Sequence, residues 1–217
     1  MQHKLKIQAI ILAFALCLLF TPPLHAQDYL QHVTFEFGAG FSFPVGQTAD
    51  HTKMGWNFVA SGGPRFNRRF SLTADFSLHY LNIKNSFIEP ATGVDLSLGA
   101  IMRMWSLTAN PTFEFIKQER FTSYATGGYG LYNRHLDLAA NGPVPASVCD
   151  QFWDACVSNP PPTVISGDRS PYKGGFNVGG GVMFGSHTKF FTEVRYHRMF
   201  TTKTPTELIP LTFGIRW

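Results

Sequence analysis

Charged side chains are scarce in this sequence, and long apolar runs are scarcer. Asp, Glu, Lys and Arg together make up 15% of the 217 residues. One long apolar run extends from Ile7 to Phe20, and it is shorter than the roughly 20 residues that a transmembrane helix needs. Because no second such run follows, the sequence excludes a bundle of membrane-spanning helices.

The first residues have the pattern of an export signal. Two lysines, the second of them Lys6, precede the apolar run, and a Pro-Pro break leads to a small residue, Ala26. We therefore expect a signal peptide over residues 1–26 and an exported domain over residues 27–217. An uncleaved helix is the alternative that the short run disfavours. A lipid-attached Cys17 is disfavoured because apolar residues continue after it, whereas a lipidated cysteine begins the mature chain.

A lasting excess of basic residues is also missing. The chain has 18 Lys and Arg against 14 Asp and Glu, and the leader contains two of the lysines and no acidic residue, so 16 and 14 remain. A nearly neutral exported domain does not support binding to nucleic acid.

Alternation of apolar and polar residues is the clearest pattern that the sequence does have. From Val33 to Phe43 the phenylalanines fall on one face and Glu36 on the other, and Phe70 to Tyr80 repeats the pattern with Asp75 on the polar face. Eight such segments predict strands over residues 33–43, 55–65, 70–81, 104–116, 121–132, 173–185, 189–199 and 207–217. Pro111 removes a ladder donor, so we expect a bulge or irregularity there.

The fold class that fits is all-β, an eight-stranded antiparallel up-and-down transmembrane β-barrel. A soluble barrel or sandwich would also alternate, but the apolar faces are too aromatic for a compact soluble core. The polar faces then line a narrow lumen, which side chains fill in a barrel of eight strands. We expect a structural network of paired charges in this lumen, and the passage of small ions is the alternative. Its members are Glu36, Asp75, Glu114, Glu193, Arg195 and Arg216.

The last hairpin carries a resemblance to a known family. The segment from Phe190 to His197, followed by Ile209 to Trp217, resembles the end of the OmpA-like outer-membrane β-barrel superfamily. Its alternating residues are similar to the signal that the outer-membrane assembly machinery recognises, which here comprises Leu211, Phe213, Ile215 and Trp217. The resemblance covers the barrel, and we expect no counterpart of the peptidoglycan-binding domain of longer relatives.

This resemblance implies a location more than an activity. We expect a protein of the cell outer membrane, surrounded by outer-membrane lipids and lipopolysaccharide, that has no enzyme activity, no cofactor and no metal. It would anchor surface loops that contact an unidentified partner outside the cell. Passage of small solutes or hydrophobic compounds is one alternative function.

Hydrolysis of lipid A or phospholipid acyl chains is the other alternative. The segment Arg195-Tyr196-His197 is faintly similar to the histidine segment of lipid A deacylases. Those enzymes have a Ser-Asn pair shortly after the histidine, where this chain has Met199-Phe200. Without a serine beside the base, acyl transfer lacks its nucleophile. The other histidines, among them His79, show no ligand spacing.

Two cysteines lie in the longest connection, which we place between His135 and Tyr172. Cys149 and Cys156 are separated by six residues and would be exported to an oxidising compartment. We expect a disulfide between them, because it would lower the entropy of an otherwise loose loop. A metal site is the alternative, for which the neighbouring aspartates alone are poor evidence.

Overall fold

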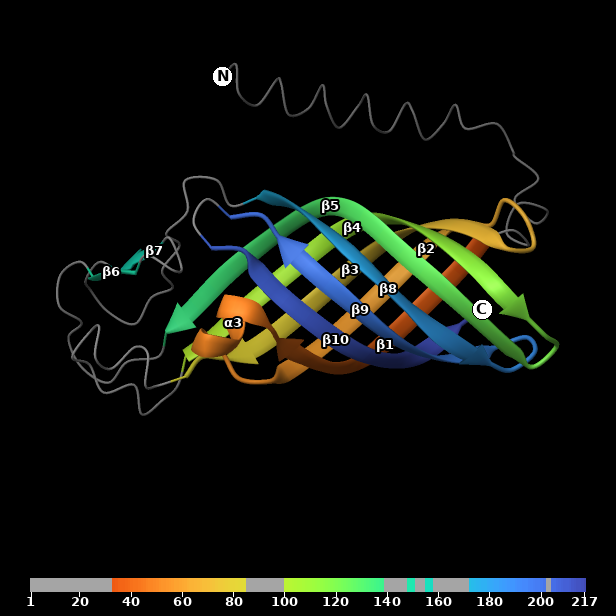
Figure 1. Ribbon diagram of the computed structural model, residues 1–217, viewed down its shortest axis with the longest axis horizontal. Helices are drawn as coiled ribbons and strands as arrows, with labels where there is room; N and C mark the ends of the chain where they lie inside the picture. Colours follow the sequence, from red (N-terminus) through yellow and green to blue (C-terminus); the bar gives the residue numbers. More distant parts are fainter. Residues whose placement is uncertain (1–32, 85–99, 139–147, 151–154, 158–171, 202–203) are drawn as a thin grey trace, which may run out of the picture. The chain divides into compact units, whose positions relative to one another are not determined.

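Eight antiparallel strands close into a barrel (Figure 1). The computed structural model describes residues 33–84, 100–138, 148–150, 155–157, 172–201 and 204–217. The predicted signal peptide, residues 1–26, lies outside this part. The barrel strands are β1 (Val33–Pro44), β2 (Gly55–Pro64), β3 (Phe70–Asn82), β4 (Ala100–Lys117), β5 (Phe121–Leu138), β8 (Lys173–Phe184), β9 (Lys189–Met199) and β10 (Thr206–Arg216).

Each strand pairs with its neighbour along the chain, and the first strand pairs with the last. Around the barrel the order is β1-β10-β9-β8-β5-β4-β3-β2. Phe35 and Trp217 exchange two backbone hydrogen bonds of 2.9 and 3.0 Å, and the direct pairing continues from Glu36 with Arg216 to Pro44 with Leu208. The predicted fold class and strand number are therefore confirmed, and the sheet has no free edge.

The period of two in the sequence separates the inside of the barrel from the outside. On β3, Asp75 and His79 are buried in the lumen, whereas Leu72 and Phe76 are 37% and 38% exposed on the outer surface. Strands β1, β9 and β10 show the same separation, so the central part of the lumen is polar and the outer surface is apolar. A soluble protein would have these two faces reversed, and only a lipid environment suits an aromatic exterior of this extent.

Three elements differ from the prediction. Strands β4 and β5 have 18 residues each, so His135 belongs to β5 and the long connection starts after Leu138. The register of β4 against β5 shifts between Glu114 and Ile116, not at the expected position, Pro111. A short helix, α3 (Gly46–His51), was not predicted. Within the described residues, no helix is long and apolar enough to cross a membrane.

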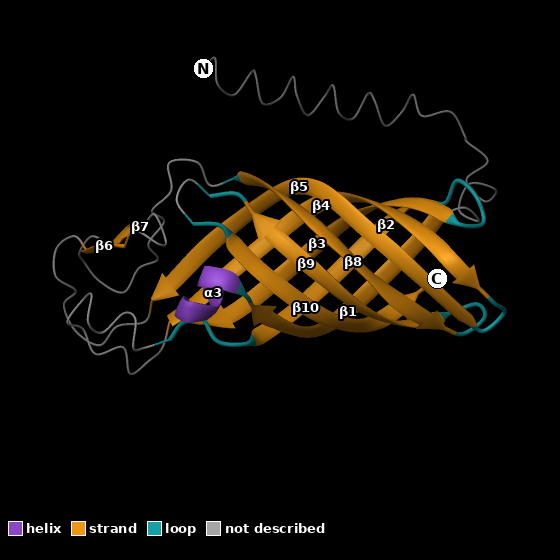
Figure 2. Cartoon of the chain, in the orientation of Figure 1, coloured by secondary structure: helices purple, strands orange, loops and turns teal. Residues whose placement is uncertain are grey.

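Helix α3 is attached to β10 at the end of the barrel opposite the turns that join β2 to β3, β4 to β5 and β8 to β9 (Figure 2). The Thr48 hydroxyl accepts a hydrogen bond of 3.0 Å from the Glu207 amide, and the Val45 amide donates to the Glu207 carbonyl. Gly46 has a φ of 56°, and a Cβ there would lie 2.2 Å from a Glu207 carboxylate oxygen. The alternation of apolar and polar residues indicates strands only, so it does not predict this helix.

Glycines on the inner wall face the largest side chains of the lumen. A Cβ at Gly175 would lie 2.7 Å from the Tyr132 ring, and one at Gly181 would lie 2.8 Å from the Tyr124 hydroxyl. These tyrosines are almost fully buried. Glycines thus lie against the large tyrosine rings inside the lumen, and this combination of large and small residues allows a narrow barrel to be packed.

Candidate functional site

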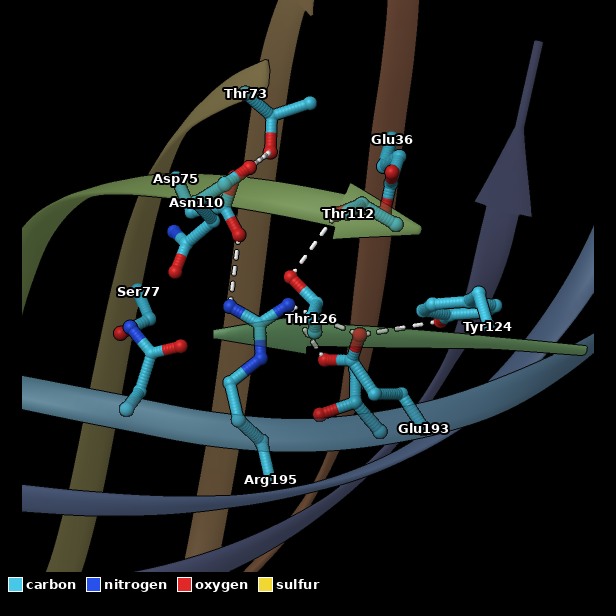
Figure 3. Close-up of polar contacts among 12 residues, drawn as sticks. Glu36, Thr73, Asp75, Ser77, Asn110, Thr112, Tyr124, Thr126, Glu193 and Arg195 are labelled. Carbon is cyan, nitrogen blue, oxygen red and sulfur yellow. Dashed lines mark hydrogen bonds and ion pairs between the residues drawn. The ribbon is translucent and has the colours of Figure 1, made fainter. Parts of the chain in front are cut away.

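The centre of the lumen holds an arginine between two carboxylates. Arg195 on β9 lies 2.7 Å from an Asp75 oxygen and 2.8 Å from a Glu193 oxygen, and all three side chains are at most 7% exposed (Figure 3). The Tyr124 hydroxyl donates a hydrogen bond of 3.1 Å to Glu193. Strands β3, β5 and β9 are thus connected across the lumen by charge-assisted bonds, which are the strong ones in a buried setting.

A second group of charges lies nearer the short turns. Arg216 forms an ion pair with Glu36 on the neighbouring strand and lies 3.9 Å from Glu114. Glu114 also pairs with Arg65 at 2.7 Å and with Lys117 at 2.9 Å. The six lumen charges named from the sequence thus lie in two groups.

One aromatic ring connects the two groups. The Arg216 guanidinium lies 4.9 Å from the centre of the Tyr124 ring, whose hydroxyl bonds to Glu193. This contact is a cation–π interaction. Sequence reasoning did not name Tyr124, because the fifth strand alternates poorly. Its position on the polar face of β5 is the only signal that could have identified it.

Uncharged polar residues fill the lumen beside the charges. The Thr108 hydroxyl accepts hydrogen bonds from Asn110 at 2.7 Å and from Asn177 at 3.2 Å, and Thr112 donates to Thr126 at 2.9 Å. These residues come from β4, β5 and β8. Sequence analysis missed this set, because threonine and asparagine on a polar face carry no sign of which partner they meet.

Two histidines lie in contact in the half of the lumen that is farther from the short turns. The rings of His79 and His197 are 5.3 Å apart in an edge-to-face arrangement. The two ring nitrogens of His79 lie 2.8 Å from the Ser42 hydroxyl and 3.1 Å from the Ser77 hydroxyl. The Tyr132 hydroxyl lies 3.2 Å from Nδ1 of His197. Nothing in the spacing of the histidines along the chain predicts this contact, since His79 lies on β3 and His197 on β9.

Apolar side chains occupy the lumen beyond the histidines. They point inward at the end of the barrel farther from the short turns, and they are at most 3% exposed. The set comprises Leu81, Ile83, Met102, Met104, Met199 and Leu208. Near the other end, Tyr124 packs with Met183 and Phe191, and Val59 contacts this cluster. The lumen is thus packed in layers, with apolar groups on both sides of the central charges.

The proposed assembly signal lies on the outer surface of the last strand. Phe213, Ile215 and Trp217 are 48%, 36% and 50% exposed. Leu211 shares their face, while Thr212 and Arg216 point into the lumen. The Trp217 ring stacks on Phe37 with centroids 5.6 Å apart, so this face is continuous with the apolar surface of β1.

The two cysteines lie opposite one another in a small hairpin. Strands β6 (Val148–Asp150) and β7 (Ala155–Val157) are antiparallel, and Cys149 pairs directly with Cys156. Residues opposite in antiparallel strands have Cβ atoms about 4.5–5.5 Å apart, close to the spacing that a disulfide requires. Residues 151–154 and 158–171, with their aromatic and proline residues, lie outside the described part.

We predict that Cys149 and Cys156 are bonded to each other in protein taken from cells. The register brings their backbones together, and the bond closes a short loop, which stabilises it by about 2 to 3 kcal/mol. Mass spectrometry of unreduced peptides will show one cross-linked species. Free thiols at both positions, in protein shielded from reductant, would disprove the disulfide.

The acidic side chains of the lumen bond to other side chains of the barrel. In the part of the chain that the structure describes, no three His, Cys, Asp or Glu residues gather in a way that could hold an ion. The lumen carboxylates are instead bonded to arginine, lysine and tyrosine.

Known proteins resemble the chain in structure and not in sequence. No protein-family model matches it, and no curated protein does. Neisserial surface protein A (NspA) is 14% identical, with 85% of this chain and 95% of that chain covered and a TM-score of 0.55. The attachment invasion locus protein Ail of Yersinia pestis (15% identity, 86% and 97% covered, TM-score 0.43) and OprG of Pseudomonas aeruginosa (10%, 86% and 96%, 0.45) also match. At this identity, the NspA match shows the fold.

Proposed function

We propose that this chain, an outer-membrane β-barrel with the fold of the OmpA-like superfamily, is a non-enzymatic anchor whose barrel is sealed and whose outer connections contact something outside the cell. The proposal rests on one observation. Arg195, Asp75 and Glu193 bridge the lumen at its centre and are almost completely buried. A bore filled by bonded charges leaves no room for bulk water, and it makes the barrel rigid.

Passage of small solutes is the competing function, and one observation favours it. Within the described residues, several buried polar atoms beside the central ion pairs lack a partner. They are Asp75 Oδ1, Asn110 Oδ1, Asn177 Oδ1 and Arg195 Nε. Such atoms are where we expect ordered water. A few bound waters fit a sealed scaffold, because the apolar layer beyond the histidines separates them from the outer mouth.

Acyl hydrolysis is less well supported than either of these functions. His197 is 3% exposed and faces the lumen, where its ring contacts His79 and the Tyr132 hydroxyl. Ser42 does lie 2.8 Å from His79, but both are at most 1% exposed. A lipid ester reaches a barrel from the bilayer or from the rim, so these groups are not positioned to attack it.

Lipids and the assembly machinery complete the set of proposed partners. The apolar exterior fits outer-membrane lipids and, on the outer side, lipopolysaccharide. The outward face of Leu211, Phe213, Ile215 and Trp217 fits recognition during assembly.

Conductance separates the sealed anchor from a channel. In planar bilayers, we expect the purified protein to show no steady ion current, and the triple variant Asp75→Ala, Glu193→Ala, Arg195→Ala to open a measurable one, because it removes the central bridge. Arg198→Ala is the matched control, since Arg198 is a half-exposed arginine on the same strand that pairs with Glu207 at 3.2 Å. A steady current through the unaltered protein would contradict the proposal.

A further inference from the structure

The three short turns of the barrel carry a concentration of positive charge. Ranges 64–70, 114–121 and 184–189 contain six Lys and Arg against two Glu, a net charge of four positive units. The six are Arg65, Arg68, Arg69, Lys117, Arg120 and Lys189, which we call the basic rim. This excess is larger than that of the whole exported domain, so the positive charge of the protein is gathered at one end.

Hydrogen bonds between the turns make the basic rim one surface. The Lys117 ammonium donates to the Arg68 carbonyl at 2.6 Å, and the Glu114 amide donates to the Arg69 carbonyl at 2.8 Å. The Gly185 amide donates to the Arg120 carbonyl at 3.1 Å. The turn between β2 and β3 is thus fixed to the turn between β4 and β5, which is fixed to the turn between β8 and β9.

The members of the basic rim divide by what their side chains contact. Arg65 and Lys117 pair with Glu114, and Lys189 lies 3.4 Å from the Thr122 hydroxyl. The other three, Arg68, Arg69 and Arg120, are exposed, and no ion pair joins them to an acidic residue in the described part of the chain. The Asn67 side chain accepts hydrogen bonds of 2.8 Å from the amides of Arg69 and Phe70, which fixes the turn.

Exposed aromatic residues adjoin the basic rim and indicate how deep it lies in the membrane. Phe66 lies within the turn between β2 and β3, is 61% exposed and stacks on Phe70. Phe190, next to Lys189, is 67% exposed, and Phe184 contacts Phe121. Such a ring of aromatics marks the boundary between hydrocarbon and headgroups. The cations therefore lie at the level of the headgroups, and turns this short cannot project them far into the aqueous phase.

We propose that the basic rim binds the phosphates of anionic phospholipids in the periplasmic leaflet. The short turns and Trp217 lie at the same end of the barrel (Figure 1), which in barrels of this class is the periplasmic one. Cations beside an apolar ring attract anionic headgroups, and arginine presents a fork of donors that fits a phosphate. The inference rests on the membrane location in the proposed function and not on a closed lumen.

Lipid selectivity tests the proposal. The protein is reconstituted in phosphatidylcholine bilayers, and electron paramagnetic resonance measures the association of spin-labelled phosphatidylglycerol relative to spin-labelled phosphatidylcholine. We expect the unaltered protein to prefer phosphatidylglycerol by about fivefold, the effect of roughly one surface cation. The triple variant Arg68→Gln, Arg69→Gln, Arg120→Gln should lose most of this preference. Adding 0.5 M salt should also weaken the preference, because salt screens the attraction between exposed charges.

A single pair of variants supplies the control. Arg69→Gln should reduce the preference, whereas Lys53→Gln, at an exposed cation near α3 and the other end, should not. Equal effects of both, or a triple variant that keeps the full preference, would overturn the proposal. Displacement of the labelled lipid by soluble peptidoglycan fragments would overturn it in favour of a cell-wall ligand. A current through the unaltered protein would count against the sealed lumen and leave this result unchanged.

Discussion

Replacing Arg195 by leucine will lower the free energy of unfolding by about 3 to 5 kcal/mol, because the change leaves Asp75 and Glu193 buried without their common partner. Unfolding in urea after reconstitution in lipid vesicles, followed by tryptophan fluorescence, measures the loss. Bound water near these carboxylates would place the value toward the lower end of the range.

Two further variants identify the cause of this loss. Arg198→Leu removes an arginine from the same strand, but this side chain lies on the outer surface and is 41% exposed in its ion pair with Glu207, so the cost should be about 0 to 1 kcal/mol. Adding Asp75→Asn and Glu193→Gln to Arg195→Leu should recover part of the loss, since no uncompensated charge then remains. If Arg195→Leu costs no more than Arg198→Leu, the central ion pairs do not stabilise the barrel.

Replacing Trp217 by aspartate will remove most of the assembled protein from the membrane of living cells and change the stability of the purified barrel little. A charge on the lipid face near the interface costs about 0 to 1 kcal/mol, and the lost stacking on Phe37 adds about 0.5 to 1.5 kcal/mol. A larger fall in assembled protein must come from recognition. The amount of heat-modifiable protein in isolated membranes measures assembly.

Trp56 supplies the matched control for Trp217. It is also 50% exposed on the outer surface, and its ring stacks on Tyr80 with centroids 4.2 Å apart. Trp56→Asp should therefore cause a similar loss of stability without the loss of assembled protein. Equal assembly of the two variants would mean that Trp217 is an ordinary member of the aromatic surface.

The sequence predicts the strands well because one physical rule produces them. A period of two, with phenylalanine against serine, threonine and glutamate, specifies the two faces of β1 and β3 without reference to any neighbour. Where this rule is obscured, prediction is incomplete. The start of β4 near Ala100 and the end of β5 near Leu138 alternate poorly, and the structure extends both strands beyond their predicted bounds.

The contacts inside the lumen depend on quantities that no single strand encodes. Whether Arg195 meets Asp75, or His79 meets His197, depends on the stagger of strands around the barrel. The residue types suggest that carboxylates and arginines will pair, but they do not say which. Tyr124 shows the limit clearly, because it connects Arg216 to Glu193 from a strand whose faces the sequence leaves ambiguous.

The pairing of β1 with β10 implies an order of events during folding. Hairpins between neighbouring strands join residues that are close along the chain, whereas Glu36 and Arg216 come from its two ends, so their contact bears the largest loop-closure entropy and should form late. Until then two strand edges remain open to other chains. The ion pair between Glu36 and Arg216 joins β1 to β10 and can form only after these two strands have paired. It therefore slows the separation of β1 from β10 in the finished barrel.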